Sequence, residues 1–148
     1  MSGYVEGRGV GAVGSTIIGQ VPAPASGRGV VVLLGRATGV NLNAVAATTI
    51  FTTPASGFTR CEVTIITVDN FSGTPTTNAV SFGASATPTD WLGATVLSGT
   101  AGVGKALRLF PQINVGYAEY GTNIAFVANV TIGGAAITCD IDVYGVYE

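Results

Sequence analysis

The sequence contains no histidine and only one lysine among its 148 residues. Histidine is the commonest general base and the commonest metal ligand among the side chains. Its absence excludes a Ser-His-Asp or Cys-His catalytic arrangement and leaves any zinc site without its usual nitrogen ligand. We therefore expect that this protein is not an enzyme.

Charged residues are also scarce, at 9% of the chain against about 25% in an ordinary soluble domain. The hydrophobic content is 47%, so Gly, Thr, Ser, Ala and Asn take the place of charge. A soluble monomer usually keeps a charged surface. Six basic and eight acidic side chains cannot build one. We expect either a surface covered by neighbouring subunits or a rigid β protein coated in small polar residues.

The few charges are unevenly distributed. Residues 1–40 carry three arginines against one glutamate, and residues 41–148 carry three bases against seven acids. The net charges of these parts are therefore +2 and −4. A nucleic-acid-binding surface needs clustered Lys and Arg, so the sequence predicts no nucleic-acid partner.

Neither a targeting segment nor a membrane segment is expected. The stretch MSGYVEGRG has no basic region followed by an apolar run, as a signal peptide would. The longest aliphatic stretch is Val30–Leu34, far shorter than the roughly 20 residues that a helix needs to cross a bilayer. We expect synthesis in a cytoplasm and no membrane partner.

The chain divides into two regions. Residues 1–28 are dense in glycine, end with Pro22 and Pro24, and show no sustained period. Glycine loses the most conformational freedom on ordering, so this region is predicted to be an extended arm that becomes ordered only against a partner. Residues 29–148 are predicted to form one β-sandwich domain.

Short segments rich in Val, Ile, Thr, Phe and Tyr recur along residues 29–148, with turn residues between them, and this pattern favours a sandwich or barrel. The predicted strands are Val30–Leu34, Ala47–Thr53, Arg60–Val68, Asn78–Phe82, Leu92–Leu97, Ala106–Phe110, Ile113–Tyr117, Asn123–Ile132 and Ile137–Tyr147. A turn is expected at Pro88–Asp90, with a helical turn near Asp90 as the only helix. The predicted fold class is an all-β, jelly-roll-like sandwich of about eight strands.

Two predicted strands show clear alternation. In Arg60–Val68, the side chains of Cys61, Val63 and Ile65 are expected on one face. In the last strand, apolar residues alternate with polar ones, which predicts one buried and one outward face. The apolar set is Ile137, Cys139, Ile141 and Val143, and the polar set is Thr138, Asp140 and Asp142.

Two glycine motifs have the spacing of phosphate-binding loops. Gly9, Gly11 and Gly14 match a dinucleotide fingerprint, but no strand precedes them and no helical pattern follows. Gly99–Ala106 matches a P-loop until its last position, where Ala106 replaces the hydroxyl that binds Mg²⁺. We interpret these as a glycine-rich arm and a hairpin loop, and we expect no cofactor.

The remaining candidates for chemistry are two aspartates and two cysteines. Asp140 and Asp142 are most simply a solvated strand face or partners of an arginine, with a Ca²⁺ site or a catalytic pair as alternatives. Cys61 and Cys139 are expected to be reduced thiols in the core; a disulfide is the alternative, and two cysteines alone make only half a zinc site. No metal site is predicted.

Aromatic residues allow two readings. Trp91, Tyr117, Tyr120, Tyr144 and Tyr147 could form a sugar-binding platform, or could be ordinary packing and subunit contacts, where aromatics are enriched.

The whole resembles a family of small structural proteins from tailed bacteriophages. The resemblance lies in the glycine-rich arm, in a Thr/Ala/Val/Gly body almost without lysine, and in the segment Thr48–Gly57 followed by Arg60–Val68. Within that group the chain is most similar to capsid decoration (cement) proteins, which are commonly trimers on the outer shell at local three-fold positions. The resemblance implies a virion protein on the capsid exterior, with the major capsid protein lattice and further copies of itself as partners.

The resemblance also suggests how the arm acts. Burial of Ile17, Ile18, Val21 and Val30 in grooves of the shell would contribute apolar contact. Arg8 and Arg28 would pair with acids of the shell protein. Many identical weak sites then give avidity. The alternatives are a receptor- or glycan-binding β domain of a tail fibre or adhesin, and a coat protein that assembles by itself.

Overall fold

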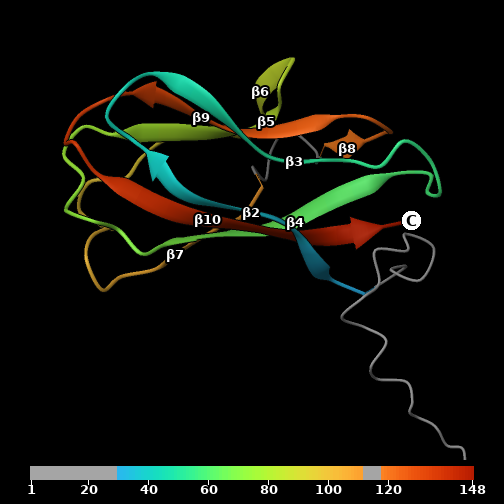
Figure 1. Ribbon diagram of the computed structural model, residues 1–148, viewed down its shortest axis with the longest axis horizontal. Coiled ribbons are helices and arrows are strands. Elements are labelled where there is room, and N and C mark those ends of the chain that lie inside the picture. The colour runs from blue at the N-terminus through green and yellow to red at the C-terminus, as the bar shows by residue number, and fades with distance from the viewer. Residues whose placement is uncertain (1–29, 112–117) are drawn as a thin grey trace, which may run out of the picture.

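The computed structural model describes residues 30–111 and 118–148, and these residues form a sandwich of two antiparallel sheets without any helix (Figure 1). The strands are β2 (Val32–Asn41), β3 (Ala46–Thr52), β4 (Cys61–Asp69), β5 (Ala79–Ala84), β6 (Thr87–Val96), β7 (Leu107–Leu109), β8 (Glu119–Tyr120), β9 (Ala125–Ile132) and β10 (Thr138–Tyr147). The predicted all-β sandwich is confirmed. The predicted arm, residues 1–28, and the whole of the predicted strand Ile113–Tyr117 lie outside the described residues.

The order of the strands is that of a jelly roll. One sheet, here the β10 sheet, has the order β2-β10-β4-β7, with β8 also paired to β4. The other, here the β9 sheet, has the order β3-β9-β5-β6. The antiparallel pairs are nested along the chain: β2 with β10, β3 with β9, β4 with β7 and β8, and β5 with β6. A long hairpin rolled up on itself produces this nesting, as the sequence pattern predicted.

The core lies between the sheets and is centred on Trp91. This side chain is 1% exposed, and its Nε1 donates a hydrogen bond to the backbone oxygen of Val63 at 2.8 Å. The rings of Phe82 and Phe126 meet it edge-on, with centroids 6.3 and 6.4 Å away. Because Trp91 belongs to the β9 sheet and Val63 to the β10 sheet, this bond joins the two layers.

The predicted faces of β10 are confirmed, and the prediction for β4 is wrong in its second half. Cys139, Ile141 and Val143 of β10 are all buried, as is Ile137 just before the strand. In β4, Cys61 and Val63 are buried, but Ile66 is buried where Ile65 was expected. The register explains this, because Tyr144 pairs with Ile65 and the next residue, Gly145, pairs with Val63. Thr64 is thus an extra residue, a β-bulge that reverses the faces.

The turn and helical turn expected around Asp90 are also wrong. The turn is at Ser85 and Ala86, and Pro88 and Asp90 lie within β6. Proline is tolerated there because β6 is an edge strand, where a missing N–H removes no ladder bond. The pairing shifts register between Phe82 and Ala84, so β6 bulges at this point.

Candidate assembly surface

Asp90 fills the bulge of β6 and ties it to the neighbouring elements. Its Oδ1 accepts hydrogen bonds from the backbone N–H of Ala84 at 3.1 Å and from the hydroxyl of Tyr120 at 2.8 Å. Glycine at position 83 provides the space for the carboxylate, because a Cβ there would stand 2.3 Å from this oxygen. Burial and the bond to Asp90 both raise the pKa of Tyr120, so its hydroxyl stays protonated as a donor. The carboxylate therefore acts as a structural clasp.

Charge is segregated between the two sheets. The described residues include eleven charged side chains, four basic and seven acidic, of which only Asp90 lies on a strand of the β9 sheet. The other ten lie on strands of the β10 sheet or within two residues of their ends. They are Arg36, Arg60, Glu62, Asp69, Lys105, Arg108, Glu119, Asp140, Asp142 and Glu148.

Apart from the partly exposed Asp90, the accessible surface of the β9 sheet is uncharged. Its strands carry nine exposed residues, and all of them are alanine, threonine, valine or isoleucine. They are Ala46, Ala47, Thr49, Thr52, Thr87, Thr89, Ala94, Val96 and Ile132. The desolvation free energy of such a surface is small when a neighbouring molecule displaces its water, because no charge has to be desolvated.

Three half-exposed aliphatic side chains cross one end of this sheet, and we call them the aliphatic row: Val45, Val96 and Ile132. Val96 and Ile132 both pair with Ala79, one from each side. Val45 precedes β3, in a segment that lies against the residue after Ile132, since a Cβ on Gly133 would meet the Asn43 oxygen. Their exposed fractions are 67%, 54% and 49%. Contiguous exposed apolar residues mark contact sites more often than scattered ones do.

The two aspartates of β10 make structural contacts. Asp142, with a side chain 7% exposed, accepts two hydrogen bonds from the guanidinium of Arg36, at 2.5 and 2.6 Å. Asp140 accepts bonds from the backbone N–H of Gly39 at 2.8 Å and from the amide of Asn70 at 2.9 Å, and these hold its pKa below the usual value. Asp142 is thus an arginine partner, one of the two simple expectations. Within residues 30–111 and 118–148, no group of three or more Cys, Asp or Glu is placed to hold a metal ion.

The two cysteines are free and buried, as expected. Cys61 pairs with Tyr147 across the strands, and Cys139 stands eight residues earlier on β10. At about 3.3 Å per residue the two thiols are roughly 26 Å apart, which excludes the alternative of a disulfide between them. Burial raises the pKa of each thiol to about 12.

The other predicted sites fall into three groups. The segment 99–106 is a loop, as expected, but it crosses from β6 in one sheet to β7 in the other, so it is not a hairpin loop. Trp91 and Tyr120 are buried, which rules them out of a surface sugar platform, and Tyr117 lies outside the described residues. The arm residues lie outside the described residues too: Arg8, Ile17, Ile18, Val21 and Arg28, with the motif Gly9–Gly14.

Sequence reasoning missed the aliphatic row and the exposed Phe110. Alternation marks which residues share a face, but not that three strand ends from different parts of the chain meet. In the part of the chain that is described, no helix has the length and apolar character to cross a membrane.

No protein-family model matches this chain, and no curated protein is similar to it in sequence. Among solved structures, a chain of the cyanophage Pam1 capsid asymmetric unit is 16% identical, with 80% of this chain and 84% of that chain covered and a TM-score of 0.49. A chain of the acidic stable capsid structure of Helicobacter pylori bacteriophage KHP30 is also 16% identical, with 80% and 91% covered and a TM-score of 0.47.

Proposed function

We propose that this chain is a structural protein of a bacteriophage particle, a decoration (cement) protein that binds the outer surface of the head as a trimer and stabilises it. The observation that carries the proposal is the uncharged surface of the β9 sheet with its aliphatic row. The β9 sheet faces the shell in this proposal, and residues 1–28 extend over neighbouring shell subunits. The protein contributes contacts and no chemistry.

The aliphatic row supplies a useful share of the binding energy. Burying a Val or Ile side chain completely is worth about 1.5–3 kcal/mol, so a half-exposed one contributes about 1 kcal/mol. Together Val45, Val96 and Ile132 give about 3 kcal/mol, which is roughly a hundredfold in affinity for one site. Repetition over a lattice multiplies weak sites of this kind into stable attachment.

The experiment is to add the purified full chain to heads that lack it and to measure occupancy by co-sedimentation and electron microscopy. Val96→Asp combined with Ile132→Asp is expected to reduce occupancy at least a hundredfold at limiting concentration, because a charge is then desolvated at the contact. Ser56→Asp, on an exposed loop, is the matched control and keeps full occupancy. Deletion of residues 2–28 is expected to leave a folded body that no longer binds.

Four results would contradict the proposal. Wild-type occupancy of the truncated chain would remove the role of the arm, and wild-type occupancy of the double aspartate variant would remove the role of the β9 sheet. Shells formed by the chain alone, seen by electron microscopy, would make it a coat protein. Specific binding on a glycan array without binding to heads would make it a receptor-binding domain.

A further inference from the structure

A row of four apolar side chains crosses the outer face of the β10 sheet, from β2 to the end of β7. Leu33 of β2 pairs with Tyr144 of β10, and Tyr144 pairs with Ile65 of β4. The pairing of β4 with β7 continues this row to Phe110, the residue that directly follows β7. We call Leu33, Tyr144, Ile65 and Phe110 the β10 band.

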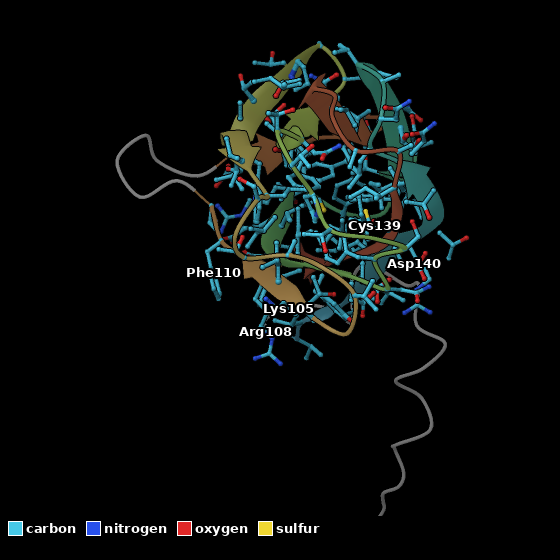
Figure 2. All side chains as sticks on the ribbon, turned by 90° about the vertical axis from the view of Figure 1, so that its left-hand side faces the viewer. Lys105, Arg108, Phe110, Cys139 and Asp140 are labelled. Atoms are coloured by element: carbon cyan, nitrogen blue, oxygen red, sulfur yellow. The ribbon has the colours of Figure 1, made fainter. Side chains whose placement is uncertain are left out.

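The β10 band points away from the core. Its neighbours along the strands, Val143 in β10 and Ile66 in β4, are buried in the core, and successive side chains of a strand point to opposite faces. Leu33 is 50% and Phe110 is 60% exposed, and the two central side chains are half-buried. Figure 2 shows Phe110 projecting outward at the lower left of the body, on the same side as Arg108. An aliphatic and an aromatic side chain are thus left in water at the two ends of one apolar strip.

Charged side chains border the band on both sides. On one side, the next row of the ladder holds Arg36, Asp142 and Arg108. On the other side, the next row holds Glu62 and Glu119. Covering these charges would cost desolvation free energy, so the band fits a narrow and uncharged occupant.

The exposed area of the band also suits a short segment better than a whole subunit. A large apolar side chain has about 200 Å² to bury, so the exposed parts of Leu33 and Phe110 amount to roughly 200 Å². A stable interface between two proteins buries about 800 Å² on each partner. The band alone is therefore too small to hold two copies of the body together.

The chain before Val30 joins the body at one end of the band. Val31 stands two residues before Leu33 and is 53% exposed, and Val30 is 46% exposed. Residues 1–29 precede this point. A segment tethered so close to its site has an effective concentration in the millimolar range, which favours it over any separate peptide.

The composition and length of the arm match the band. Residues 9–27 carry no charge. Within them, residues 17–21 hold three aliphatic side chains, Ile17, Ile18 and Val21. Five extended residues cover about 16 Å, and four neighbouring strands span about 14 Å. Residues 22–29, with two prolines and two glycines, are long enough to let the chain turn back over the sheet.

We propose that residues 17–21 bind the β10 band of the same chain, as a latch that holds the arm on the body until the protein reaches a head. The contact rests on the band and on the tether. Its release on a head rests on the proposed function, in which the same arm residues bind the shell. Because the arm has to leave the band first, the latch lowers the apparent affinity for heads. The β9 sheet stays free for the shell throughout.

The first test is disulfide cross-linking of the full chain under mild oxidation. Ile18→Cys with Ile65→Cys is expected to form a disulfide within one chain, seen by non-reducing electrophoresis and mass spectrometry. Ile18→Cys with Thr49→Cys, on the exposed surface of the β9 sheet, is the matched control and is expected to form about tenfold less. The native Cys61 and Cys139 are buried and stay reduced.

The second test is cleavage of the arm by thermolysin, which cuts before aliphatic residues and needs the arm to be released from the band. Leu33→Ser with Phe110→Ser removes both exposed ends of the band and is expected to speed cleavage of the arm about tenfold. Val96→Ser with Ile132→Ser removes as many apolar side chains from the β9 sheet and is the matched control, with an unchanged rate. Circular dichroism confirms that each variant is folded.

Cross-linking to the band no stronger than to the control site, or a cleavage rate that the band variant leaves unchanged, would overturn the inference. Cross-linked dimers in place of the internal disulfide would overturn it too, and would assign the band to the arm of a second copy. The two proposals fail separately. If both tests behave as expected but neither wild type nor the band variant binds heads, the latch stands and the decoration function falls; if heads bind a chain whose arm never cross-links to the band, the reverse holds.

Discussion

Removing the hydroxyl of Tyr120 is expected to destabilise the fold without emptying the core. In Tyr120→Phe the ring keeps its edge-on contact with Phe126, whose centroid is 5.5 Å away. Only the 2.8 Å hydrogen bond to Asp90 is lost. That bond joins β8 of the β10 sheet to the bulge of β6 in the β9 sheet, so its loss weakens a link between the layers.

The magnitude follows from the acceptor. Hydrogen bonds to charged groups contribute about 1.5–3 kcal/mol, and Asp90 keeps one other donor, the Ala84 N–H at 3.1 Å. We therefore expect a loss of about 1.5–3 kcal/mol in the free energy of unfolding. At about 4 °C per kcal/mol for a chain of this size, the melting temperature falls by about 6–12 °C.

The assay is urea unfolding combined with calorimetry for wild type, Tyr120→Phe, Asp90→Ala and the double variant. Asp90→Ala also leaves the Ala84 N–H without its acceptor, so its cost is expected to be larger, at about 2–5 kcal/mol. If the clasp operates as described, Tyr120→Phe adds little once Asp90 is gone, and the coupling energy of the cycle equals the cost of the single change. A Tyr120→Phe variant within about 0.5 kcal/mol of wild type would refute the reasoning.

The remaining predictions concern the thiols, one glycine and two arginines. Burial raises the pKa of both thiols from 9.0 to about 12, so the unfolded state releases their protons at a lower pH than the folded state does. The free energy of unfolding is therefore expected to fall as the pH rises from about 9 to about 12. Replacing both cysteines by alanine should flatten that pH dependence in urea titrations. Gly83→Ala is expected to cost about 1–3 kcal/mol in chemical denaturation, because its Cβ would collide with Asp90. In thermal melts, Arg36→Met should cost more than Arg60→Met, since Asp142 is covered while both partners of Arg60 are at least one-quarter exposed; equal effects would contradict this.

The sequence predicted the layers of the fold because they follow from local patterns. Apolar and polar residue types alternate without a break from Ile137 to Val143, so the buried apolar set could be read directly, although Asp142 of the other face is also covered. The extent of β2 could not be predicted from the sequence. It continues through Gly35 and Gly39 to Asn41, although glycine usually weakens a strand. Gly35 is required because β3 passes so close that a Cβ would stand 2.6 Å from that of Phe51.

Bulges mark the limit of prediction from alternation. Nothing local in Thr64-Ile65-Ile66 shows which of the two isoleucines turns inward, since the choice is made by where Tyr144 and Gly145 of the partner strand pair. The same holds for Asp90, which was expected to end a turn that begins at Pro88. Its hydrogen-bond donors are the backbone N–H of Ala84 and the hydroxyl of Tyr120, thirty residues away, so only the assembled sandwich shows it to be a clasp.

The segregation of charge bears on why the chain has so little of it. Two explanations were open, a surface covered by neighbours and a surface coated in small polar residues. If the chain needed its few charges only for solubility, an even distribution over the whole surface would serve best, because exposed apolar patches promote association. Here ten of eleven described charges are on one sheet or at its ends, and the exposed residues on the strands of the other are threonine, alanine and half-exposed aliphatics. Charge is therefore confined almost entirely to one side of the sandwich, which favours the first explanation for the β9 sheet.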